Sequence, residues 1–183
     1  MSFRQDVLLM PLRHIQEWQP ALQAEGIPET LREMILDNHS LTQRLKQLHH
    51  QEFFVRVLCH EWQEPISEEK AFLHCDDQRA SIREVLLFGS GKPVVFARSV
   101  LPESSLMGDN AELLNLGDKP LGEYIFSQPD LRRGPIEVAP LPARQFNQRI
   151  NVTFDKETAW ARRSLFYLRE KPILVCEVFL PVK

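Results

Sequence analysis

PILVCEVFLP, residues 172–181, is the stretch that decides the fold of this chain, because a single carboxylate interrupts an apolar run between two prolines. Side chains alternate between the two faces of a β-strand, so Glu177 shares one face with Ile173, Val175 and Phe179, and the opposite face is apolar as well. Apolar residues on both faces predict a central strand with Glu177 buried in it. Burying an unpaired carboxylate costs several kcal/mol, so some partner must compensate it.

A second apolar strand carries the opposite charge. In SIREVLLF (81–88), Arg83 shares its face with Val85 and Leu87. One interpretation is a buried ion pair between Arg83 and Glu177, or exposure of both at a thin edge of the sheet. The other is that both face one cavity and hold the two ends of a polar ligand. A guanidinium suits a carboxylate, and a glutamate suits a hydroxyl, as acceptor of a hydrogen bond or of a proton.

More strands are expected around these two, in short β-branched or aromatic segments bounded by Gly, Pro or charged residues. They are placed at 52–62, 81–88 and 93–102, within 132–140, and in a C-terminal hairpin over 162–181 that turns at REKP. FGSGKP (88–93) predicts the turn of another hairpin. A helix over 157–170 stays open as an alternative to the first strand of the C-terminal hairpin.

Helices are expected before the first of these strands. From Glu29 onward apolar residues recur at helical spacing, and DNHS (37–40) interrupts them. Ser40 and Gln43 have the spacing of a capping box, which predicts that a second helix starts at Leu41.

Two shorter helices are predicted at 110–116 and 120–128, where Pro120 suits a first helical position. Residues 1–28 are expected to be irregular. No linker or repeat divides the chain, so 1–183 is interpreted as a single domain. Its expected class is α+β, a single antiparallel β-sheet with helices packed on one face.

Composition limits the partners. The chain has 183 residues and a formal net charge of −3, with no block of like charge, so neither nucleic acid nor an anionic membrane surface is an expected partner. No apolar run approaches the length of a membrane span. The odd cysteines Cys59, Cys75 and Cys176 form no CxxC and indicate free thiols in a reducing compartment. We expect a cytoplasmic monomer.

Other polar groups give weaker signals. The histidines lack the spacing that fixes metal geometry, so no metal site is predicted. The adjacent pair Arg162 and Arg163 is interpreted as a solvated strand face rather than an anion site.

Several strings of the sequence occur together in one known family. In chain order they are SLTQR (40–44), IREVLL (82–87), ARSVLP (97–102), LGDKPLGEYIF (116–126), IEV (136–138), RRSLF (162–166) and KPILVCEVFLP (171–181). Their order and spacing resemble the chorismate pyruvate-lyase family, whose members eliminate pyruvate from chorismate to give 4-hydroxybenzoate for ubiquinone biosynthesis. The resemblance implies the chorismate lyase-like fold and a carbon–oxygen lyase that needs no cofactor.

The resemblance also implies site residues. Arg83 stands at the family's arginine and would hold the ring carboxylate of chorismate, helped by the backbone N–H of Leu121. Glu177 stands at the family's carboxylate in the last strand and would take the ring hydroxyl, with the N–H of Leu41 beside it. Arg83 and Glu177 are therefore the expected catalytic residues. Arg98 is the candidate for the second carboxylate, on the enolpyruvyl arm.

Two parts of the chain depart from the family. The stretch 139–160 is longer than expected for the family and is interpreted as an insert or a lid loop. Residues 1–28 match the family poorly. The family is similar in fold to the effector-binding domains of some transcription regulators, so a non-catalytic domain that binds aromatic acids is the alternative. Because residues 1–28 are too short for a DNA-binding domain, the enzyme is favoured.

Overall fold

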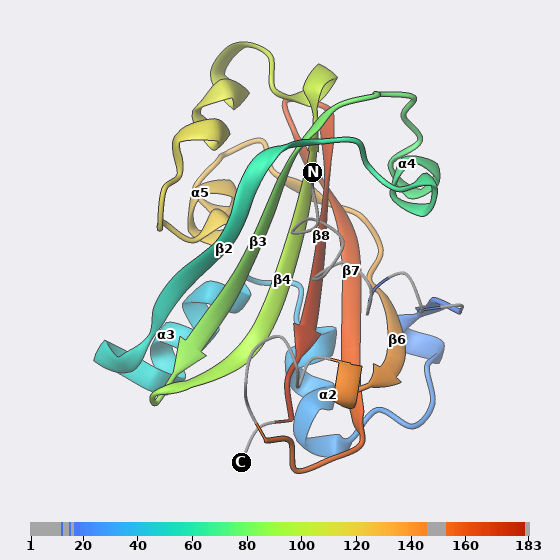
Figure 1. The fold of residues 1–183 in the computed structure, drawn as a ribbon, viewed down its shortest axis with the longest axis vertical. Coiled ribbons are helices and arrows are strands. Elements are labelled where there is room, and N and C mark those ends of the chain that lie inside the picture. Colours follow the sequence, from blue (N-terminus) through green and yellow to red (C-terminus); the bar gives the residue numbers. More distant parts are fainter. Residues whose placement is uncertain (1–11, 13–14, 16, 146–152, 182–183) are drawn as a thin grey trace, which may run out of the picture.

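An eight-stranded antiparallel sheet forms the framework of the protein (Figure 1), seen here in a computed structural model that describes residues 12, 15, 17–145 and 153–181. The strands follow the order β1-β6-β7-β8-β4-β3-β2, and β5 pairs with β7. Their bounds are β1 Gln19–Pro20, β2 Phe54–Gln63, β3 Ala80–Gly89, β4 Lys92–Pro102, β5 Arg132–Arg133, β6 Glu137–Pro142, β7 Thr158–Leu168 and β8 Lys171–Phe179. The predicted α+β class with a single antiparallel sheet is confirmed, but the helices are not confined to one face of it.

The strand that contains Glu177 is central, as its sequence predicts. β8 lies between β7 and β4, and most of its residues are buried. Residues 158–168 form a strand, so the alternative helix over 157–170 is wrong. Tight turns close both hairpins: Ser90 and Gly91, and then Arg169 and Glu170, have positive φ, the backbone that two-residue hairpin turns require.

Helices cover both faces of the sheet, although three of the four described α-helices lie on one. Their bounds are α2 Glu29–Leu36, α3 Leu41–His49, α4 Ser67–Leu73 and α5 Leu121–Phe126, with 3₁₀-helices η1 Ala21–Gln23, η2 His50–Glu52, η3 Glu103–Ser105 and η4 Gly108–Asn115. α2, α3 and α5 pack on the face that carries Val85 and Val175. The sequence reading missed α4, which packs on the opposite face through Leu73.

Two segments that were expected to be irregular or to form a loop, residues 1–28 and 139–160, contribute strands to the sheet. Within residues 1–28, the short strand β1 pairs with β6 and Ile15 is buried against the sheet, so the segment is less irregular than expected. Residues 139–142 and 158–160 belong to β6 and β7, so they form no loop. Part of the remaining stretch, 146–152, lies outside the described residues.

Candidate active site

The antiparallel register brings the two strand charges to one face of the sheet. Two rows of residues cross the central strands there: Arg83, Ser99, Val175 and Ser164 in one, and Val85, Ala97, Glu177 and Arg162 in the next. Arg83 and Glu177 are thus two strands and two residues apart, about 12 Å between Cα atoms at ordinary sheet spacings. The small side chains between them leave room for a ligand above the sheet.

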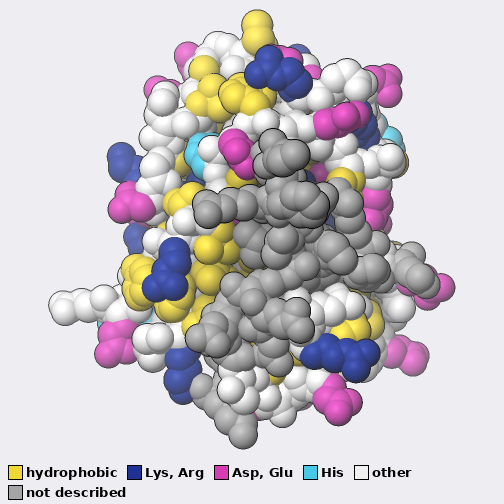
Figure 2. All heavy atoms as spheres, in the orientation of Figure 1, with side chains coloured by type: hydrophobic (Ala, Val, Ile, Leu, Met, Phe, Trp, Pro, Cys, Tyr) yellow, Lys and Arg dark blue, Asp and Glu magenta, His cyan; other side chains and the backbone are white. Residues whose placement is uncertain are grey.

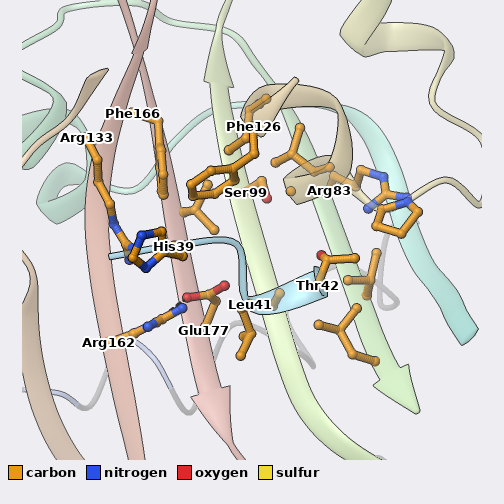
Figure 3. A pocket seen from close by; sticks show the side chains of 18 residues that line it. His39, Leu41, Thr42, Arg83, Ser99, Phe126, Arg133, Arg162, Phe166 and Glu177 are labelled. Atoms are coloured by element: carbon orange, nitrogen blue, oxygen red, sulfur yellow. Dashed lines mark hydrogen bonds and ion pairs between the residues drawn. The ribbon is translucent and has the colours of Figure 1, made fainter. Parts of the chain in front are cut away.

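A pocket occupies this room, with α3 and α5 above the sheet (Figure 3). Eighteen residues line it: His39, Leu41, Thr42, Arg83, Val85, Leu87, Ala97, Ser99, Pro120, Leu121, Gly122, Ile125, Phe126, Arg133, Arg162, Phe166, Val175 and Glu177. Both Arg83 and Glu177 are among them, together with Leu41 and Leu121. Within the described part of the chain, Arg83 and Glu177 form no ion pair with each other. Of the two interpretations, the structure therefore agrees with the one in which both residues face one cavity.

Arg83 is fixed by the loop that precedes α5. Its Nη2 donates to the carbonyl oxygens of Gly117 at 3.0 Å and Lys119 at 2.9 Å, and its side chain is buried. Burial lowers the pKa of Arg83, and Asp118 partly opposes this. The buried Nε of Arg83 has no partner among the described residues. A buried donor without an acceptor is costly, so this cation is prepared for an anion from outside the protein.

The starts of two helices face the same pocket. The hydroxyl of Ser40 accepts from the N–H of Gln43 at 3.3 Å, which confirms the predicted cap of α3. Pro120 is the N-cap of α5 rather than its first residue and offers no side-chain cap, so the first N–H groups of α5 lack that acceptor. The two helix starts pack closely, because a Cβ on Gly122 would lie 2.8 Å from Oγ1 of Thr42.

Glu177 has a partner that the sequence reading did not assign. The Nε of Arg162 lies 2.5 Å from Oε2 of Glu177, and the two residues are neighbours across β7 and β8. Nη1 of Arg162 also donates to the carbonyl oxygens of Met34, Ile35 and Asp37, where α2 ends. Arg162 therefore fixes the orientation of the Glu177 carboxylate and anchors α2 over the sheet.

Arg133 is the third cation of the pocket. Its Nε donates to the hydroxyl of Ser164 at 3.1 Å and its Nη1 to the carbonyl oxygen of Asp37 at 3.1 Å, and it lies over the ring of Phe166. Burial, and then the neighbouring Arg162, lower the pKa of Arg133 to about 10. Arg133 stays cationic at neutral pH.

Arg98 does not reach the pocket, so its expected role at the second carboxylate is wrong. Its guanidinium lies on the opposite face, 2.7 Å from Glu69 of α4 and 2.8 Å from Glu84 of β3. A β-bulge sets the face on which Arg98 lies, because the register of β3 and β4 shifts between Leu87 and Phe88. Without that shift, the hairpin would place Arg98 opposite Arg83, on the pocket face.

The interpretation of Arg162 and Arg163 as one solvated strand face is also wrong. Consecutive strand residues point to opposite faces, so Arg162 lines the pocket while Arg163 binds Glu68 and Glu137 on the other side of the sheet. The same alternation, applied to RRG at 132–134, could have separated Arg133 from Arg132. The sequence reading missed Arg133, Arg162 and His39 as pocket residues.

Among the described residues, no group of three or more His, Cys, Asp or Glu side chains could hold a metal ion. No helix within the same residues is long and apolar enough to span a bilayer. None of the described residues in 139–160 lines the pocket, and the lid interpretation stays a prediction.

Known proteins resemble this chain along nearly its whole length. The family model described as chorismate lyase matches residues 12–183, so the match begins well inside the segment 1–28 that seemed unrelated. The chain is 36% identical over 182 residues to a "Probable chorismate pyruvate-lyase" of Psychromonas ingrahamii, covering 96% of each. It is 40% identical over 169 residues to a protein of the same name from Thiobacillus denitrificans, covering 90% of this chain and 88% of that one.

Solved structures with the same fold include domains of transcription regulators. A GntR-family regulator of Bacillus cereus aligns with a TM-score of 0.53 and 15% identity, over 72% of this chain and 93% of that one. The C-terminal domain of the histidine utilization repressor of Pseudomonas syringae also aligns with 0.53, at 12% identity, over 70% of this chain and 91% of that one. At these identities the likeness shows the fold alone.

Proposed function

The chain belongs to the chorismate lyase family, and we propose that its pocket holds chorismate between Arg83 and Glu177 while pyruvate is eliminated. The activity is that of a chorismate pyruvate-lyase, with 4-hydroxybenzoate for ubiquinone biosynthesis as the aromatic product. One observation supports these site assignments above all others. A buried guanidinium whose Nε has no partner among the described residues and an oriented carboxylate line the same pocket from two strands.

The ring carboxylate of chorismate binds at the Arg83 end. The free Nε of Arg83 points to a charge-assisted hydrogen bond that the protein itself does not provide. The N–H of Leu121, at the start of α5, is the second donor for the same carboxylate. Both residues are placed by one loop, since the carbonyls of Gly117 and Lys119 that hold Arg83 lead directly into α5.

The ring hydroxyl binds at the Glu177 end. Glu177 accepts the hydroxyl hydrogen, and the N–H of Leu41, the first residue of α3, lies on the same side of the pocket. Arg162 holds one oxygen of the Glu177 carboxylate, so the direction of the hydrogen bond to the substrate is set before binding. We assign Glu177 to orientation of the substrate.

The elimination of pyruvate from chorismate needs few protein groups beyond those that bind the ring carboxylate and the ring hydroxyl. The hydrogen on the hydroxyl-bearing ring carbon leaves, the ether bond to the enolpyruvyl group breaks, and the released enolpyruvyl group takes up a proton to become pyruvate. Aromatisation of the ring supplies the driving force. The enzyme then contributes the orientation of the ring and stabilisation of the shifting charge, and the chemistry calls for no redox or Lewis-acid group.

The test of the function is a direct assay. Purified protein mixed with chorismate, without added metal or nucleotide, is expected to release 4-hydroxybenzoate and pyruvate in equal amounts above the spontaneous background. Chromatography quantifies the first product and lactate dehydrogenase coupling the second. Binding of 4-hydroxybenzoate without turnover would instead support the alternative, a non-catalytic domain for aromatic acids.

Glu177→Gln is expected to reduce kcat by about 10- to 100-fold while the protein stays folded, because the amide oxygen can still accept the hydroxyl hydrogen bond. A residue that removed the proton would cost more, at the upper end of about 10²- to 10⁴-fold for general bases. Single-turnover kinetics at saturating chorismate separate the two. A loss above about 10³-fold would assign Glu177 to proton removal.

The compartment, the oligomeric state and the absence of a nucleic-acid partner stay predictions from the sequence. We propose a cytoplasmic monomer that binds no nucleic acid, consistent with its net charge of −3. On the face seen in Figure 2, basic and acidic side chains are interspersed, and neither sign gathers into a continuous patch.

A further inference from the structure

The function proposed above leaves one cation of the pocket unused. Chorismate carries two carboxylates, and Arg83 with Leu121 accounts for the ring carboxylate only. Arg162 is engaged by Glu177 and by three carbonyl oxygens. Arg133 lines the same pocket, and its hydrogen-bond acceptors, Ser164 and Asp37, contribute a hydroxyl and a backbone carbonyl.

The charges of the pocket are unbalanced near Arg133. Arg133 and Arg162 both donate through Nη1 to the carbonyl oxygen of Asp37, so two like charges are held close together. Glu177 is the only carboxylate among the eighteen lining residues, against three arginines. Two like charges so close in a partly buried site repel each other. Glu177 and Asp37 also act on Arg133, but burial and Arg162 outweigh them, so a further anion beside Arg133 would be stabilised.

The position of Arg133 suits the side arm of the substrate. In Figure 3 Arg133 stands beside Phe166 and His39, on the Glu177 side of the pocket and away from Arg83. In chorismate the enolpyruvyl ether is on the ring carbon next to the one that bears the hydroxyl. If the hydroxyl is at Glu177, the side arm must also lie at this end of the pocket. His39 lines the pocket from the loop between α2 and α3, so the side arm would lie between that loop and the sheet.

We infer that Arg133 binds the enolpyruvyl carboxylate of chorismate, and that it thereby distinguishes the dianionic substrate from the monoanionic aromatic product. This inference rests on the proposed function. Elimination divides the two carboxylates between two products, and pyruvate removes the one that Arg133 holds. The product 4-hydroxybenzoate then keeps only the contacts at Arg83, Leu121, Leu41 and Glu177.

Arg133→Gln tests this division, since glutamine removes the charge and can still donate to the Asp37 carbonyl. We expect kcat/KM for chorismate to fall about 10- to 50-fold, the loss of one charge-assisted contact. The Kd for 4-hydroxybenzoate, from calorimetric titration, should change less than about threefold. Arg133→Lys keeps the charge and should restore part of the lost kcat/KM.

Arg132→Gln is the matched control, because Arg132 precedes Arg133 in β5 but is exposed, pairs with Glu170 and lies over Tyr167. It should leave both constants unchanged. Equal losses for chorismate and 4-hydroxybenzoate in Arg133→Gln, or no loss for either, would overturn the inference. If Arg133→Gln does not fold, Arg133→Lys takes its place. The inference then expects kcat/KM for chorismate to fall more than the affinity for 4-hydroxybenzoate, relative to wild type. Equal changes in the two, or no change in either, would overturn the inference.

Failure of the proposed function would look different. In that case the wild-type protein would release no pyruvate, and titration of wild type and Arg133→Gln with chorismate as a plain ligand would still test the anion site. A weaker Kd for chorismate alone in the variant would support the site, and equal Kd values would overturn it.

Discussion

Replacing Arg83 with alanine is expected to lower kcat/KM for chorismate by about 30- to 4,000-fold, because removal of a buried charged partner typically costs about 2–5 kcal/mol in binding and each 1.4 kcal/mol is about tenfold. Affinity for 4-hydroxybenzoate should fall in parallel, since the product keeps the ring carboxylate that Arg83 holds. The fold should survive, because the groups left behind are the carbonyls of Gly117 and Lys119 and the exposed carboxylate of Asp118, which water can solvate. Steady-state kinetics, product titration and circular dichroism measure the three effects.

Arg79→Ala is the control for Arg83→Ala. Arg79 is exposed, pairs with Glu103 and lies over Trp62, away from the pocket-lining residues. Its loss should leave turnover within about twofold of wild type, as exposed ion pairs contribute little. A folded and active Arg83→Ala variant would remove the carboxylate site from this pocket.

Arg98→Met is expected to lower the free energy of unfolding by about 3–5 kcal/mol, the usual cost of removing one partner from a buried ion pair. Arg98 is 1% exposed, and its loss leaves the buried carboxylates of Glu69 and Glu84 without this cation. Urea denaturation should show a lower midpoint with an unchanged m-value. Because Arg98 lies on the face away from the pocket, kcat/KM per folded molecule should stay within about twofold of wild type.

A second variant separates charge from packing. Adding Glu84→Gln and Glu69→Gln to Arg98→Met should recover part of the lost stability, since the two carboxylate charges that Arg98 neutralised are then gone. The glutamine at 69 still accepts from the N–H of Ile66, as Glu69 does. A stable Arg98→Met variant that has lost activity would contradict this account and return Arg98 to substrate binding.

The sequence alone predicted the features that depend on local pattern. Alternation in PILVCEVFLP predicts a central strand with Glu177 on one face, and the structure places β8 there. Ser40 and Gln43 predict the cap of α3, and their hydrogen bond forms. These features follow from residues close together in the chain, where strand alternation and capping act directly. The strings shared with the chorismate lyase family pointed to Arg83, Leu121, Leu41 and Glu177, and all four line one pocket.

Tertiary structure alone decided which charges meet. The partner of Glu177 is Arg162, because β7 and β8 are neighbours with these two residues in register, while Arg83 is two strands away. One bulge residue in the β3–β4 hairpin moves Arg98 from the pocket face to the opposite face, where α4 supplies Glu69. Composition cannot reveal a one-residue shift of register, yet with a side-chain period of two it changes the face of every later residue. The sequence therefore determined the strands and the chemistry of their residues, and the register determined the pocket.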